Sequence, residues 1–121
     1  MVKRRILVVD DDAVTREALA EVLQDEGYEV ALAADGLEAV AMLSTYQPDM
    51  VLTDLQMPGL NGMNVLTHVK NVYPTTPVII FTAHATLDAE REARRQGAQD
   101  FLQKPLDFDD VLVRIARALT P

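Results

Sequence analysis

Short, continuous apolar runs alternate with longer segments of helical periodicity along this chain, and this alternation limits the folds open to it. The apolar runs span residues 6–9, 28–33, 50–53, 77–81 and 101–102. The runs at 6–9, 50–53 and 77–81 lack polar alternation, which predicts strands buried on both faces in a parallel sheet between helices. The run at 28–33 alternates, which predicts a half-buried strand at an edge of that sheet.

The segments between these runs repeat apolar residues at the spacing of one helical face. We expect Gly27 to end the first helix, Asn61-Gly62 to open the third, and Asp107 to cap the last. The predicted inward side chains are Val14, Ala18, Leu19, Val22, Leu23, Leu37, Val40, Ala41, Met63, Leu66, Val69, Val72, Leu87, Ala89, Ala93, Phe108, Val111, Leu112, Ile115 and Leu119. The helix predicted at 87–96 has few of them, so it should shift position more easily than its neighbours.

This order of strands and helices predicts one α/β domain over residues 1–121. Strands separated by helices run parallel, with right-handed crossovers and helices on both faces of the sheet. We therefore expect a doubly wound, flavodoxin-like sheet of five parallel strands in the order 2-1-3-4-5. Its topological switch point lies between the first and third strands, where ligands bind in open α/β sheets. Those two strands end at Asp10-Asp11 and at Asp54.

Composition excludes several classes of protein. The chain has 121 residues, a formal net charge of −8 and no cysteine. An acidic chain has no general attraction for nucleic acid, and the absence of cysteine excludes disulfides and thiolate metal sites. No apolar run is long enough to span a bilayer, and the N-terminal segment does not resemble a signal peptide. We expect a cytoplasmic protein that binds neither membranes nor, through this domain, nucleic acid.

Polar side chains follow four of the predicted strands, and their types fit phosphoryl chemistry. Asp10-Asp11 and Asp54 would crowd three carboxylates, which repel one another unless they take up protons or bind a cation. Oxygen ligands of this kind suit Mg²⁺, or Mn²⁺ in its place. A carboxylate beside such a metal and near Lys104 can attack phosphorus and form an aspartyl-phosphate. The Thr82 hydroxyl could donate a hydrogen bond to the phosphoryl oxygens.

Taken together, the chain resembles a known family. The residues that carry the resemblance are Val8-Val9-Asp10-Asp11, Asp54 with Met57-Pro58-Gly59, Thr82-Ala83 and Lys104-Pro105. Together, in this order, they are similar to the signature of response-regulator receiver domains, and the likeness extends over essentially the whole chain. It implies a phosphorylation-dependent signalling switch of a two-component system rather than a turnover enzyme. Such a switch would at most phosphorylate itself and slowly dephosphorylate itself.

The resemblance also implies a role for each residue near the predicted switch point. Asp54 is similar to the phosphoacceptor, and Asp11 to the direct metal ligand. Asp10 would assist through a water molecule, and the backbone carbonyl of Gln56 would complete the protein ligands together with Asp54. Lys104 resembles the phosphate-binding lysine, and the family usually has a cis peptide bond at the position of Lys104-Pro105.

Further positions resemble those that transmit the signal. Thr82 is similar to the switch hydroxyl, and Phe101 to the aromatic residue that turns inward when that hydroxyl moves toward the phosphoryl group. The resemblance also implies that Gln56 and His84 occupy the positions that tune the rate of phosphate loss in this family. The resemblance implies a sensor histidine kinase or phosphotransfer protein as the phosphate donor. It implies an output domain or protein partner that binds the surface of the fourth helix, fifth strand and fifth helix. A second copy of the chain, in a phosphorylation-dependent homodimer, is a further implied partner.

Other interpretations of the same residues remain open. The segment from Asp10 to Val14 also fits the first motif of haloacid-dehalogenase-like phosphatases, with Asp10 as nucleophile and Asp12 as general acid. That interpretation leaves Asp54 unexplained, and we expect Asp12 to cap the first helix instead. A receiver-like adaptor that binds partners without phosphorylation is a further alternative. Taken singly, Phe101 is typical of plain core, Thr82 of a hydroxyl bonded to the backbone, and Lys104 of a solvated charge.

Overall fold

The computed structural model describes residues 3–120, and there five strands alternate with five helices. In chain order they are β1 (Arg5–Val9), α1 (Ala13–Asp25), β2 (Glu29–Ala33), α2 (Gly36–Tyr46), β3 (Met50–Asp54), α3 (Gly62–Val72), β4 (Val78–Thr82), α4 (Leu87–Arg95), β5 (Asp100–Gln103) and α5 (Phe108–Leu119). All paired strands are parallel, and their order is β2-β1-β3-β4-β5. The predicted doubly wound, flavodoxin-like α/β fold is confirmed. The predicted boundaries of β1, β2, β3 and α4 differ from the observed ones by one residue at one end, and those of β4 and β5 differ by one residue at both ends.

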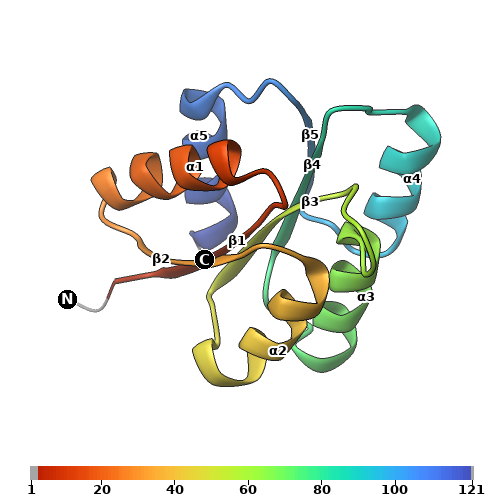
Figure 1. The fold of residues 1–121 in the computed structure, drawn as a ribbon, viewed down its shortest axis with the longest axis horizontal. Helices are drawn as coiled ribbons and strands as arrows, with labels where there is room; N and C mark the ends of the chain where they lie inside the picture. The colour runs from red at the N-terminus through yellow and green to blue at the C-terminus, as the bar shows by residue number, and fades with distance from the viewer. Residues whose placement is uncertain (1–2, 121) are drawn as a thin grey trace.

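Helices cover both faces of the sheet (Figure 1). The pair α1 and α5 lies on one face, and α2, α3 and α4 lie on the other, so the sheet separates two apolar layers. Strands β3 and β4 are buried throughout, and β1 is buried after Arg5, because both faces of each are covered. Strand β2 lies at an edge and is only partly buried, as its alternating sequence predicted.

Local side-chain hydrogen bonds fix where the helices begin. The N-cap residues, each accepting a hydrogen bond from a backbone N–H of the first turn, are Asp12, Asp35, Asn61, Thr86 and Asp107. The predicted caps Asp12 and Asp107 are thereby confirmed. Gly27 follows α1 with a φ of +95°, a conformation that glycine adopts without the steric penalty of a side chain.

The prediction is wrong for five of the side chains that were expected to point inward. Val14, Leu37, Leu87 and Val72 are 76%, 68%, 61% and 52% exposed, and Ala41 is also exposed. The first three lie in the first turns of α1, α2 and α4, beside the edge of the sheet rather than over it, and Val72 ends α3. An apolar residue at a helix end can continue the periodic pattern without reaching the core. In α2 the buried face instead carries Ala39 and Leu43.

Helix α4 is as sparsely anchored as its sequence predicted, because Ala93 is its only fully buried residue. Its other inward contact comes from Ala89, which packs against the core while partly exposed. Within residues 3–120, none of the helices has both the length and the apolar character needed to cross a membrane.

Candidate functional site

Three carboxylates meet at the C-terminal edge of the sheet, where β1 and β3 end side by side. Asp10 directly follows β1, Asp11 is the next residue, and Asp54 is the last residue of β3. One carboxylate oxygen from each of these three side chains lies within 4.8 Å of the other two. Asp10 is fully buried and Asp54 is 5% exposed, whereas Asp11 is open to solvent. The predicted convergence at the switch point is therefore confirmed.

Lys104 brings a cation to this cluster from the loop that follows β5. Its Nζ lies 3.0 Å from an Asp10 oxygen and 3.5 Å from an Asp54 oxygen. The Lys104 backbone N–H donates to the Thr82 carbonyl at 2.8 Å, and the Lys104-Pro105 bond is cis, as the resemblance implied. Burial lowers the pKa of Lys104, whereas the hydrogen bond to Asp10 and the charges of both carboxylates raise it. The raising effects together outweigh burial, so the pKa of Lys104 lies above its usual value. Lys104 is therefore a fixed positive charge and not a solvated one.

The environment of Asp54 opposes ionisation of its carboxyl group. Burial, followed by the negative charge of Asp10, raises the pKa of Asp54 to about 6, although Lys104 acts in the opposite direction. A cation bound among the three carboxylates would relieve this repulsion. All the donors are hard carboxylate oxygens, and such donors fit Mg²⁺ or Mn²⁺. The residues present thus suit the metal that the resemblance implied.

Asp10 is held from three sides. One carboxylate oxygen accepts the Asp12 backbone N–H at 2.9 Å, and the other accepts Lys104 Nζ. The Arg16 guanidinium, through Nη1, donates to the Asp10 backbone carbonyl at 2.7 Å. Sequence reasoning missed Arg16. The sequence places Arg16 near the start of the predicted first helix. The spacing of residues along a helix does not show whether such a long side chain turns toward solvent or back toward the preceding strand.

The remaining predicted site residues lie at different distances from the cluster. Thr82 is fully buried at the end of β4, and its Oγ1 accepts the His84 backbone N–H at 3.2 Å, while the His84 side chain is exposed. Phe101 is 7% exposed and pairs with Ile80 in the sheet, one register position before Phe81, which pairs with Asp54. Phe101 therefore belongs to the apolar layer that α2, α3 and α4 cover.

The Asp12 side chain caps α1 and is not oriented for catalysis. Its carboxylate accepts the Val14 backbone N–H at 3.2 Å and the Thr15 hydroxyl at 2.8 Å. The hydrogen bond from Thr15 comes first among the causes that lower the pKa of Asp12 below its usual value. A helix cap with a lowered pKa does not fit the general acid of the phosphatase interpretation, which calls for a raised one.

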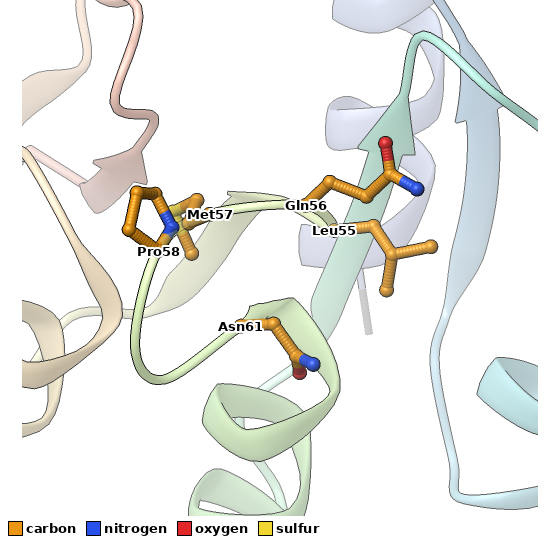
Figure 2. A pocket seen from close by; sticks show the side chains of 5 residues that line it. All are labelled: Leu55, Gln56, Met57, Pro58 and Asn61. Atoms are coloured by element: carbon orange, nitrogen blue, oxygen red, sulfur yellow. The ribbon is translucent and has the colours of Figure 1, made fainter.

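The loop that follows β3, residues 55–61, borders the site. Figure 2 shows it leaving the strand at Leu55, turning at Pro58 and entering α3 at Asn61. A shallow hollow of about 540 Å³ is lined by Leu55, Gln56, Met57, Pro58 and Asn61. The Gly62 N–H donates to the Leu55 carbonyl at 2.8 Å, so the base of the loop is closed.

The chain belongs to the response regulator receiver domain family, whose model matches residues 6–116. It is 42% identical to the DNA-binding transcriptional regulator NtrC of Proteus hauseri over 120 residues, which are 99% of this chain and 25% of that protein. It is 38% identical to sporulation initiation phosphotransferase F of Bacillus subtilis over 111 residues, which are 92% of this chain and 90% of that protein. The crystal structure of a CheY-like receiver domain protein from Methanospirillum hungatei JF-1 superimposes with a TM-score of 0.94 at 30% identity, covering 98% of this chain and 94% of that one.

Family membership settles the class of protein. The chain is a receiver domain of the two-component type, a phosphoacceptor module of phosphorylation-dependent signalling, and the phosphatase interpretation is set aside. Receiver domains bind Mg²⁺ at an acidic pocket, and those of NtrC-like regulators interact with histidine kinases and are joined to output domains. This chain spans about a quarter of the length of the NtrC relatives.

Proposed function

We propose that Asp54 is the phosphoacceptor of this receiver domain and that its phosphorylation controls an output domain or protein partner. The observation that carries this proposal is the position of Asp54, a nearly buried carboxylate with a lysine Nζ 3.5 Å away and two further carboxylates beside it. An Asp54 oxygen would attack the phosphorus of a phosphohistidine on a sensor histidine kinase or phosphotransfer protein. The phosphorus–nitrogen bond breaks, the imidazole keeps the electron pair and takes a proton, and an aspartyl-phosphate forms.

The neighbouring residues would bind and stabilise the transferred group. Lys104 neutralises phosphoryl oxygens, and the Thr82 hydroxyl donates a hydrogen bond to them. Asp11, Asp54 and the backbone carbonyl of Gln56 would hold Mg²⁺ or Mn²⁺, with Asp10 assisting through water. When bound, the metal offsets the negative charge of the phosphoryl group. The charged lysine and the crowded acids support this division of roles.

Loss of the phosphate would reset the switch. Water attacks the phosphorus of the aspartyl-phosphate, which releases inorganic phosphate and restores the carboxylate. Gln56 and His84, both exposed, would tune the approach of that water. The domain therefore acts on its own phosphoryl group at most, and it turns over no separate substrate.

Movement of Thr82 toward the phosphoryl group would change the positions of Phe101 and α4. Thr82 on β4 pairs with Gln103 on β5, and Phe101 lies two residues before Gln103 on β5. Helix α4 has one fully buried residue, so a small bias should change its position more readily than that of α3, which has four. The surface of α4, β5 and α5 would then present the signal.

The partners follow from this scheme. We expect residues 1–121 to act as a single cytoplasmic receiver domain that is joined to, or binds, an output module, and that neither binds nucleic acid itself nor enters a membrane. A histidine kinase or phosphotransfer protein would supply the phosphate, and the α4-β5-α5 surface would support a phosphorylation-dependent homodimer.

The test is phosphorylation by acetyl phosphate with Mg²⁺, followed by intact mass spectrometry. The wild type should gain one phosphoryl group, Asp54→Ala should gain none, and Asp88→Ala, which removes an exposed aspartate in α4, should behave like the wild type. An adduct that persists in Asp54→Ala but disappears in Asp10→Ala would refute the assignment of Asp54. No adduct on the wild type would favour an adaptor that works without phosphorylation.

A further inference from the structure

Helix α2 contacts the loop of residues 55–61 through a close approach that only glycine permits. Gly36, the first residue of α2, is fully buried. A Cβ placed on Gly36 would lie 2.2 Å from the Leu60 backbone carbonyl oxygen and 2.8 Å from the Leu60 carbonyl carbon. These are backbone atoms that no rotamer change can move away. The N-terminus of α2 therefore rests directly on the backbone of the loop.

A second glycine fixes the same loop at its base. A Cβ on Gly62 would lie 2.4 Å from the Asp54 carbonyl oxygen and 2.8 Å from Leu55 Cα. The N-terminal turn of α3 thus packs against the end of β3, while α2 supports the loop near its other end. Helix α2 packs beside α3 on the same face of the sheet (Figure 1). The loop lies between two rigid elements, each in contact through a glycine.

The loop is the softer side of the Gly36 contact. Helix α2 is anchored by Ala39 and Leu43, which are 0% and 1% exposed. Pro58 and Gly59, at the turn of the loop, are exposed, and Leu60 is only half-buried. Removing α2 from its place would empty the core around Ala39 and Leu43. In the loop only Leu55 and Met57 are buried in the core, at 9% and 8% exposure, so the part from Pro58 to Leu60 can move at less cost than α2. A side chain at position 36 should therefore displace the loop.

We infer that Gly36 is a positioning residue for the metal site, although α2 contributes no side chain to the carboxylate cluster. By supporting the Leu60 backbone, Gly36 keeps the loop, and with it the Gln56 backbone, in the place that the metal requires. This inference rests on the proposed role of the Gln56 carbonyl as a ligand. Groups that orient metal ligands from outside the coordination shell typically change affinity by about 10-fold to 100-fold when they are altered.

The test compares Gly36→Ala with Gly27→Ala. Gly27 has a φ of +95° and open space around its Cβ position, and it precedes β2 at the opposite end of the sheet. Gly27→Ala therefore strains the backbone without touching the loop, which makes it a control for general destabilisation. Calorimetric titration with Mg²⁺ should show binding roughly tenfold weaker in Gly36→Ala and unchanged in Gly27→Ala.

A readout that needs no metal accompanies the titration. In metal-free protein, amide hydrogen exchange of residues 56–61 should become faster in Gly36→Ala, while exchange of residues 37–46 in α2 stays slow. Leu60→Gly provides a second route if Gly36→Ala does not fold. Because Leu60 is only half-buried, that variant should fold. It keeps the backbone contact with Gly36 but gives the loop more conformational freedom at position 60, so it should also bind Mg²⁺ more weakly.

The possible results separate this inference from the proposed function. Unchanged Mg²⁺ affinity in Gly36→Ala, or faster exchange in α2 rather than in the loop, would overturn the role of Gly36. Equal weakening in Gly27→Ala would do the same, because it would show an effect of stability alone. If the wild type bound no Mg²⁺ and took up no phosphate, the proposed function would fail, and the exchange measurement would still decide whether Gly36 positions the loop.

Discussion

Replacing Asp54 by asparagine should stabilise the metal-free protein at neutral pH. Burial and the charge of Asp10 raise the pKa of Asp54 to about 6, from an ordinary value of about 3.9. The folded protein therefore favours the protonated carboxyl, and stability falls as pH rises from the unfolded-state pKa to the folded-state pKa. Integrated over that range, the penalty is about 3 kcal/mol at pH 7.5 and about 1 kcal/mol at pH 4.5. Asparagine is neutral at both values and avoids this penalty.

Urea unfolding followed by circular dichroism, with a chelator present, measures the effect. The free energy of unfolding of Asp54→Asn should exceed that of the wild type by about 3 kcal/mol at pH 7.5, and by about a third of that at pH 4.5. Glu21→Gln, which neutralises an exposed acid in α1, is the matched control and should change little. Mg²⁺ should stabilise the wild type more than Asp54→Asn, since asparagine offers a neutral amide oxygen in place of the charged carboxylate. A difference independent of pH, or a less stable variant at pH 7.5, would refute the reasoning.

Three further predictions concern the surroundings of Asp54 and the anchoring of α4. Lys104→Met removes the cation that lowers the pKa of Asp54, so carboxyl titration by NMR should place that pKa above about 6; a lower value would contradict the geometry. Gly62→Ala forces a Cβ to within 2.4 Å of a backbone oxygen, and urea unfolding should show a loss of about 1–3 kcal/mol. Asp100→Asn removes the carboxylate that arginines of α4 and α5 share, so amide exchange should quicken in α4 but not in α1; equal change in both would refute a local effect.

The sequence by itself determined the order of the elements, the parallel sheet and the edge at which the acids meet. Continuous apolar runs have to be buried on both faces, and parallel strands joined by helices place their C-terminal ends at one edge. The convergence of Asp10, Asp11, Asp54 and Lys104 follows from that topology, whatever the details of packing. The helix caps Asp12 and Asp107 were also readable, because capping depends on residues only a few positions apart.

Only the tertiary structure decided which residues at the helix ends reach the core and what holds the site in place. The exposure of Val14 and Leu37 could not be read from periodicity, because a helical pattern does not show where the sheet ends. The raised pKa of Asp54 depends on burial and on a charge that is distant in sequence. The hydrogen bond from Arg16 depends on the direction of a long side chain, and the contact of Gly36 with the loop depends on two backbones that meet in space. Such distances follow from packing between elements, which local sequence does not specify.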